Sequence, residues 1–202
     1  MAGRRAFLLG GASLGLATSV GGCLGKAYYE QNPAQKAFLD ALKALAKPAL
    51  ASSNPLQVEE AAKQSVALSE RIGAFSDWQG VLKAIDGNAQ KVAVTVEIGP
   101  QVSLYAFNDW TLAAAGSIAD LISLRSRRPP PPGLSDPAIA ALKTFRLGDR
   151  IALSGKMGEI AGSGLFDLSV LLGKSDAEHR LFLQAPRFVA RFETIAAPPA
   201  KK

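Results

Sequence analysis

The sequence predicts an α+β, mostly β fold, in which an N-terminal helical hairpin precedes a five- or six-stranded antiparallel β-barrel with one helix. Apolar residues recur at helical spacing between residues 24 and 75, whereas a period of two prevails over much of residues 78–195. Short turns rich in Gly, Pro, Asn and Asp separate the β-type runs, which favours a meander. One cysteine in 202 residues excludes an intramolecular disulfide, so core packing must stabilise the fold.

The chain begins with the pattern of an export signal rather than of a folded element. Arg4 and Arg5 precede an apolar, Gly-interrupted run over residues 6–22. The stretch from Arg4 to Leu8 resembles the twin-arginine export motif, in which one variable residue, Phe7 and Leu8 follow the arginine pair. The resemblance implies a signal peptide over residues 1–22 and folding before export. An ordinary secretion signal is the alternative.

The only cysteine lies where the apolar run ends. The stretch Val20-Gly21-Gly22-Cys23 resembles the bacterial lipobox, which implies cleavage before Cys23 and its lipidation. An uncleaved membrane anchor and a free thiol beside an ordinary cleavage site are the alternatives. Lipidation would place the protein in the bacterial cell envelope, facing the periplasm. The residue after the cysteine is Leu24 rather than Asp, which allows the outer as well as the inner membrane.

Residues 23–75 are predicted to form a tether and a helical hairpin. The pairs Asn32-Pro33 and Asn54-Pro55 each place an N-cap residue before a proline at the first helical position. The first helix is expected to break at Pro48, and Gly73 is expected to end the second. Their apolar stripes are expected to pack on each other or on the β domain. A partner-binding role for the second helix is the alternative.

Residues 76–195 are predicted to form the β domain, followed by a disordered tail over residues 196–202. Its expected elements are strands at 78–85, 91–98, 102–107 and 150–156, a helix at 137–145 capped by Asp136, and two strand pieces within 181–195 divided at Pro186. Residues 109–124 fit either a helix or a loop followed by a strand. The sequence therefore does not determine the structure of residues 109–135.

The sequence pattern of residues 76–195 resembles that of OB-fold-like domains of uncharacterised bacterial proteins. The matching stretches are Trp78-Gly80-Leu82, with Val81 in slightly shifted form, the run from Phe145 through Gly148-Asp149 to Gly155, and the run from Pro186 to Phe192. The resemblance implies a small Greek-key barrel with three strands, a helix and two more strands. Within such a barrel we expect Trp78 in the core, with a stacking platform as the alternative. Gly80 and Gly155 are expected where strands bend or approach closely.

Charge gives little support to nucleic acid as a partner. The net charge of +6 falls to +4 without the two signal arginines, and to about +2 without Lys201 and Lys202. Residues 91–107 contain Lys91, Tyr105 and Phe107, but also Glu97, and no basic cluster. We therefore do not expect nucleic-acid binding.

No catalytic, cofactor or metal motif is found. His179 is the only histidine and is expected on the surface, so neither a zinc site nor a second histidine is available. Asp149 is expected to cap its own turn rather than to act as a base. Asp109, Glu159 and Asp167 are isolated acids in the sequence. No cofactor is assigned, and whether the protein is an enzyme is left open.

Arg125, Arg127 and Arg128 precede four prolines at residues 129–132, a composition that favours polyproline II. This segment is either a stiff solvated connector or a loop that contacts a partner or an anionic headgroup. The sequence thus predicts a lipid-anchored binding or interaction module with an envelope protein as its partner. The alternative is an envelope enzyme, or a binder of small molecules or oligosaccharides, that uses the barrel mouth and the Gly-rich loop over residues 158–164.

Overall fold

The structure is a computed structural model that describes residues 27–88, 91–108, 133–157 and 175–199. The signal segment, the arginine–proline segment and the Gly-rich loop lie outside these residues. The elements in chain order are η1 (Tyr28–Glu30), α1 (Pro33–Ala51), α2 (Pro55–Ile72), β1 (Ala74–Gly87), β2 (Val92–Gly99), β3 (Val102–Phe107), α5 (Asp136–Leu142), β4 (Arg150–Met157), α6 (Asp176–Gln184) and β5 (Arg187–Ala196).

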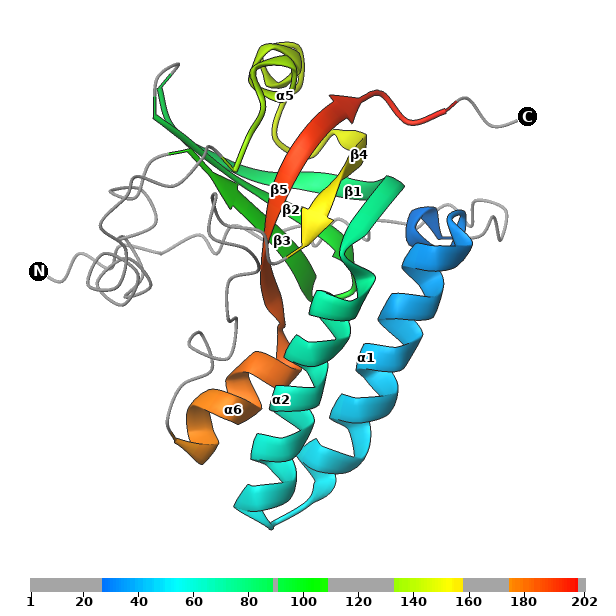
Figure 1. The fold of residues 1–202 in the computed structure, drawn as a ribbon, viewed down its shortest axis with the longest axis vertical. Helices are drawn as coiled ribbons and strands as arrows, with labels where there is room; N and C mark the ends of the chain where they lie inside the picture. Colours follow the sequence, from blue (N-terminus) through cyan, green and yellow to red (C-terminus); the bar gives the residue numbers. More distant parts are fainter. Residues whose placement is uncertain (1–26, 89–90, 109–132, 158–174, 200–202) are drawn as a thin grey trace, which may run out of the picture.

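The five strands close into a barrel in the order β1-β2-β3-β5-β4 (Figure 1). Four neighbouring pairs are antiparallel, whereas β3 and β5 are parallel. The predicted fold class, a helical hairpin followed by a five-stranded OB-like barrel, is confirmed. One detail is corrected, because the parallel β3–β5 pair makes the barrel mixed rather than wholly antiparallel.

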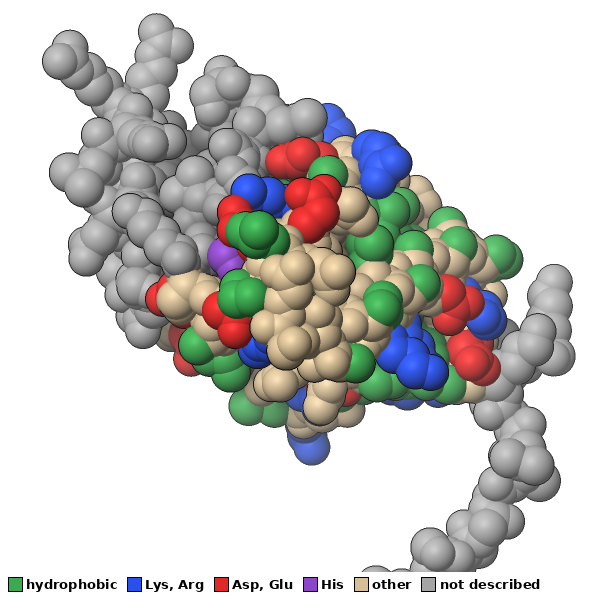
Figure 2. Space-filling model, turned by 90° about the horizontal axis from the view of Figure 1, so that it is seen from below, with side chains coloured by type: hydrophobic (Ala, Val, Ile, Leu, Met, Phe, Trp, Pro, Cys, Tyr) green, Lys and Arg blue, Asp and Glu red, His purple; other side chains and the backbone are tan. Residues whose placement is uncertain are grey.

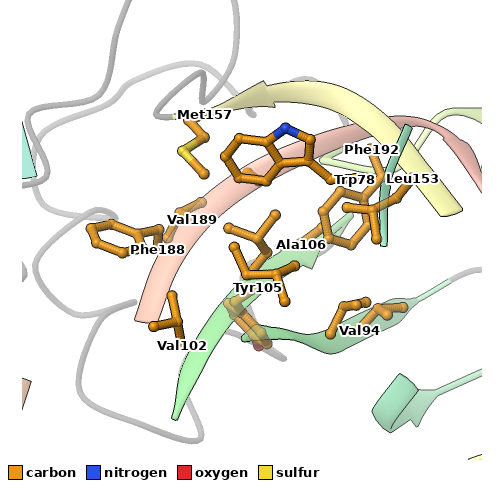
Figure 3. Packing of buried hydrophobic residues seen from close by; sticks show 14 of the residues in the cluster. Trp78, Val94, Val102, Tyr105, Ala106, Leu153, Met157, Phe188, Val189 and Phe192 are labelled. Carbon is orange, nitrogen blue, oxygen red and sulfur yellow. The ribbon is translucent and has the colours of Figure 1, made fainter. Parts of the chain in front are cut away.

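The inside of the barrel is filled by side chains. The Trp78 indole, the Phe192 ring and the Met157 side chain come together between the strands (Figure 3), and each is at most 1% exposed. Further fully buried residues are Leu82, Val94, Val96, Leu104, Ala106, Ile151 and Leu153. The expectation that Trp78 belongs to the core is confirmed, and its burial leaves no face on which a ligand could stack.

The helical hairpin begins and ends where its caps predict. The Asn32 side chain accepts hydrogen bonds from the backbone N–H groups of Ala34 and Gln35, at 3.0 and 3.1 Å. Asn54 caps α2 in the same way, and Gly73 ends it with φ +59°. The break expected at Pro48 is wrong, because α1 continues to Ala51. Proline removes one backbone hydrogen bond, but the next residue, Ala49, is buried in the core and keeps the last turn packed.

The strand piece expected from residue 181 is also wrong, because the chain forms α6 there. The Ser175 hydroxyl accepts from the Glu178 N–H while the Glu178 carboxylate accepts from the Ser175 N–H, a capping box that starts a helix. His179 and Leu183, four residues apart, share the buried side of α6. The surface position expected for His179 is therefore corrected, since a helix rather than a polar connector carries it. Pro186 does separate this element from β5, as expected.

Two boundaries also shift. β1 begins at Ala74, directly after Gly73, because the Met157 N–H bonds to the Gly73 carbonyl and extends the ladder with β4. The N-cap of α5 is Ser135 rather than Asp136, since the Ser135 hydroxyl accepts from the Ala138 N–H.

The helices cover opposite ends of the barrel. In Figure 1, α1 and α2 run side by side away from one end, α6 packs against α2, and α5 lies at the other end. The Phe38 ring joins α1 to the barrel, with its centroid 5.3 Å from that of Trp78 and 5.6 Å from that of Phe188. Among the described helices, none is long and apolar enough to cross a membrane.

Candidate functional site

A buried glutamine fixes α1 against the outer wall of the barrel. The Gln35 side-chain amide donates to the backbone carbonyls of Gln79 in β1 and Ile98 in β2, both at 2.6 Å. Its side-chain oxygen accepts from the Gln79 N–H at 2.8 Å. The side chain is fully buried, so removing it would leave three backbone groups without partners. Gln35 therefore sets the position of α1 along the two strands.

The short helix η1 lies beside the hydrogen bonds between Gln35 and Gln79. The Arg150 guanidinium donates to the Gln79 side-chain oxygen at 2.8 Å and lies 5.5 Å from the centre of the Tyr28 ring. The Tyr28 hydroxyl donates to the Glu97 carbonyl at 3.4 Å. Burial, followed by the charge of Glu97, raises the pKa of Tyr28 to about 12. These contacts place the N-terminal end of the described chain on β2 and β4.

The Tyr28 phenol should titrate later than an ordinary tyrosine. Because its folded-state pKa rises from 10.0 to about 12, the stability linked to the neutral phenol is present below pH 10 and is lost as the pH rises towards 12. Tyr28→Phe should remove one late step from the tyrosinate absorbance titration. It should also reduce the loss in urea midpoint between these pH values. An unchanged titration and an equal loss of midpoint in both proteins would contradict the assignment.

Between α1, the β2–β3 turn and the end of α6 lies a groove of about 440 Å³, here called the α1 groove. Its lining residues are Tyr29, Glu30, Leu39, Asp40, Leu42, Lys43, Ala46, Lys47, Leu50, Pro100, Gln101, Val102, Leu183, Gln184 and Pro186. Nearly every α1 residue in this set comes from one face of the helix, at steps of three and four. The groove is therefore continuous along α1.

The floor of the α1 groove is apolar and its edge is charged. Leu39 and Leu42 are buried below the surface, and Ala46 and Leu50 are half-buried. Lys43 and Lys47 are exposed on the edge, one helical turn apart, and within the described residues neither has an ion-pair partner.

The acidic groups on the same edge already have partners. The Asp40 carboxylate pairs with Lys36, and the Glu30 carboxylate accepts from the Ala27 N–H at 3.3 Å. The Lys36–Asp40 pair contributes no net charge, whereas Glu30 keeps its negative charge because a neutral N–H donor does not cancel it. Lys43 and Lys47 outnumber Glu30, so the net charge of this edge is +1.

The β2–β3 turn is shaped to form the other wall. A Cβ atom on Gly99 would lie 2.7 Å from the Leu39 side chain, so a larger residue there would require the Leu39 side chain to move. Gln101 has φ +62°, the left-handed conformation that follows a proline in a type II turn. The turn thus places Pro100 and Gln101 directly against α1.

A second hollow of about 340 Å³ lies between the β1–β2 hairpin and α5. It is lined by Ile85, Gly87, Asn88, Val92, Ile139, Leu142, Lys143 and Phe145. Its lining includes a single charged residue, Lys143. The α1 groove is the better candidate site because it is larger and combines an apolar floor with two lysines that have no ion-pair partner among the described residues.

The outer wall of β2, β3 and β5 brings together aromatic and basic groups that the sequence separates. The Arg187 guanidinium lies 4.8 Å from the centre of the Tyr105 ring and donates to the Thr95 hydroxyl at 3.0 Å. Tyr105 and Phe107 pack at 5.4 Å between centroids. Both rings are buried, so they are not free platforms for bases.

The residues to which the sequence assigns roles fall largely outside the described chain. These are Arg4, Arg5, Phe7, Leu8 and Cys23 of the signal, Arg125, Arg127 and Arg128 of the proline segment, and the isolated acids Asp109, Glu159 and Asp167. Asp149 is described and caps its turn, as expected, because its carboxylate accepts from the Arg146 N–H at 2.7 Å.

Sequence reasoning missed the α1 groove. Lys43 and Lys47 stand four residues apart beside the apolar stripe of the predicted helix, which was the available signal. The other two walls come from a turn and from a helix that was expected to be a strand, so the groove could not be assembled from the sequence.

Acidic, basic and apolar side chains are interspersed on the helical end of the molecule (Figure 2). In the described part of the chain no three His, Cys, Asp or Glu residues gather in a way that could hold a metal ion. The chain matches no protein-family model, no curated protein and no solved structure in the comparisons. The site must therefore be interpreted from its own geometry.

Proposed function

We propose that this protein is an exported bacterial lipoprotein that acts by binding a protein partner in the cell envelope. The observation that carries the binding role is the contrast between a barrel filled with side chains and an outer groove with an apolar floor. Exposed apolar surface rimmed by polar residues is typical of protein interaction sites and ligand-binding grooves. The α1 groove supports binding at the outer surface rather than inside the barrel.

The position of Cys23 supports the anchored arrangement. Four residue steps separate Cys23 from Ala27, where the described chain begins, and an extended chain of that length spans at most about 14 Å. A lipid on Cys23 would therefore hold η1 and the adjoining end of the α1 groove close to the membrane surface. A partner bound there would be another component of the membrane or its surface.

Replacing Cys23 should release the protein from the membrane. In a bacterial host that processes lipoproteins, the wild-type chain should lose residues 1–22, gain a di- or triacyl mass and remain in the membrane fraction. Cys23→Ala should show neither the acyl mass nor membrane retention, because no thiol is left to carry the lipid. Intact-mass spectrometry and membrane fractionation measure both results.

A double Arg4→Lys, Arg5→Lys variant tests the export route separately, because it alters the arginine pair and leaves the lipobox unchanged. Twin-arginine export predicts accumulation of the unprocessed precursor. Recovery of the wild-type chain from the cytoplasm at its full length and without modification would contradict the proposed localisation.

A further inference from the structure

We propose that the α1 groove binds an acidic amphipathic helix of the partner protein. The inference rests on the proposed function and adds to it the surface used and the chemistry of the segment recognised.

The shape of the floor fits a helix. Leu39, Leu42, Ala46 and Leu50 lie at three- and four-residue steps along α1, and the eleven residue steps from first to last span about 16 Å, or three helical turns. A partner helix with apolar residues at i, i+3, i+4 and i+7 presents a matching stripe. The small side chain of Ala46, in the middle of the floor, allows that helix to approach α1 closely.

The edge selects the charge of the partner. Lys43 and Lys47 are one turn apart and lack ion-pair partners within the described chain. Asp40 is paired with Lys36, and Glu30 offsets one of the two lysine charges, which leaves a net positive edge. Two carboxylates spaced by four residues on the partner helix would meet both lysines. A basic helix would bring like charges together, which disfavours binding.

An anionic lipid headgroup would also be attracted to the two lysines, but it does not explain the floor. A headgroup binds through its charge and has no apolar stripe to cover Leu39, Ala46 and Leu50. The extended apolar floor therefore favours a protein helix, and lipid binding becomes an outcome of the test.

The test uses the full chain carrying Cys23→Ala, so that no acyl group is present. The probe is a synthetic fluorescein-labelled helical peptide of about four turns, with Leu at i, i+3, i+4 and i+7 and two Glu residues four apart. Fluorescence anisotropy should show saturable binding. Lys43→Glu and Lys47→Glu should together weaken it by about tenfold, because each attraction becomes a repulsion. Lys143→Glu, which reverses an exposed lysine outside the groove, should leave binding unchanged.

A second pair of variants tests the floor rather than the charge. Ala46→Trp should abolish binding because the indole fills the groove. Ala44→Trp on the exposed side of the same helix should leave binding unchanged. A peptide with Lys in place of Glu should bind the double Lys→Glu variant better than it binds the wild-type chain. Circular dichroism of each variant separates loss of binding from loss of fold.

Three results would overturn the inference: no binding of the acidic peptide, equal binding of the acidic and basic peptides, or binding that Ala46→Trp does not change. Lysine-dependent binding to phosphatidylglycerol vesicles without peptide binding would also overturn it and would assign the lysines to lipid. None of these results bears on whether Cys23 of the wild-type chain is acylated or whether that chain remains in the membrane fraction. The lipoprotein proposal is tested by intact mass and membrane fractionation, whereas the groove is tested by peptide binding. A failure of one can therefore be distinguished from a failure of the other.

Discussion

Replacing Gly155 by alanine should lower the free energy of unfolding by about 3 kcal/mol, at the upper end of the usual cost of overpacking. A Cβ atom at this position would lie 1.9 Å from the Arg191 carbonyl oxygen of the neighbouring strand. That oxygen belongs to the backbone, so it cannot rotate away as the end of a side chain can. The β4–β5 register shifts between Ser154 and Gly155, and this irregularity brings the strands so close. Urea denaturation in the Cys23→Ala background measures the change.

Gly73→Ala is the matched control for this prediction. A Cβ atom on Gly73 would meet nothing within 4 Å, but the residue has φ +59°. With ψ −104° the residue is in a mirror-β conformation that glycine adopts freely and alanine does not. Its replacement should therefore cost the conformational penalty alone, on the order of 1–3 kcal/mol. Gly155 itself has no positive φ, so its loss should come from the contact with Arg191. A loss below about 1 kcal/mol in Gly155→Ala would show that the two strands separate at little cost and would contradict the prediction.

Replacing Phe38 by alanine should cost about 3–5 kcal/mol, the range found for aromatic residues removed from a core. The ring is 1% exposed and lies between α1 and the aromatic residues Trp78 and Phe188. The variant should also lose hydrogen-exchange protection in α1 before the barrel strands do, because the contact between them is weakened. Urea unfolding and amide exchange measure the two effects.

Leu56→Ala provides the control, since it also removes a large apolar side chain from a helix of the hairpin. Leu56 is 71% exposed, so its loss should change the free energy of unfolding by less than about 0.5 kcal/mol. A small effect of Phe38→Ala, close to that of Leu56→Ala, would mean that α1 does not depend on this ring for its attachment. The position of the α1 groove would then need another explanation.

Local signals predicted both beginnings of the hairpin helices and the end of the second, but not the end of the first or the start of α6. Asn32 and Asn54 begin helices because their side chains satisfy backbone N–H groups within three residues, a purely local requirement. Pro48 does not end α1, because burial of the turn around Ala49 outweighs the loss of one backbone hydrogen bond at the proline. The strand expected from residue 181 failed because the Ser175–Glu178 capping box was not recognised.

The sequence by itself determined the helical hairpin, most of the strands, and Gly80 and Gly155, where a Cβ atom would clash with the neighbouring strand. Each of these features depends on residues near in the chain or on the absence of a side chain. Only the tertiary structure decided that His179 is buried, that Gln35 joins α1 to β1 and β2, and that a groove lies beside Lys43 and Lys47. The α1 groove combines one helix face, the Pro100–Gln101 turn and the end of α6, segments far apart in the chain. Their meeting is fixed by closure of the barrel and by packing, which no local pattern records.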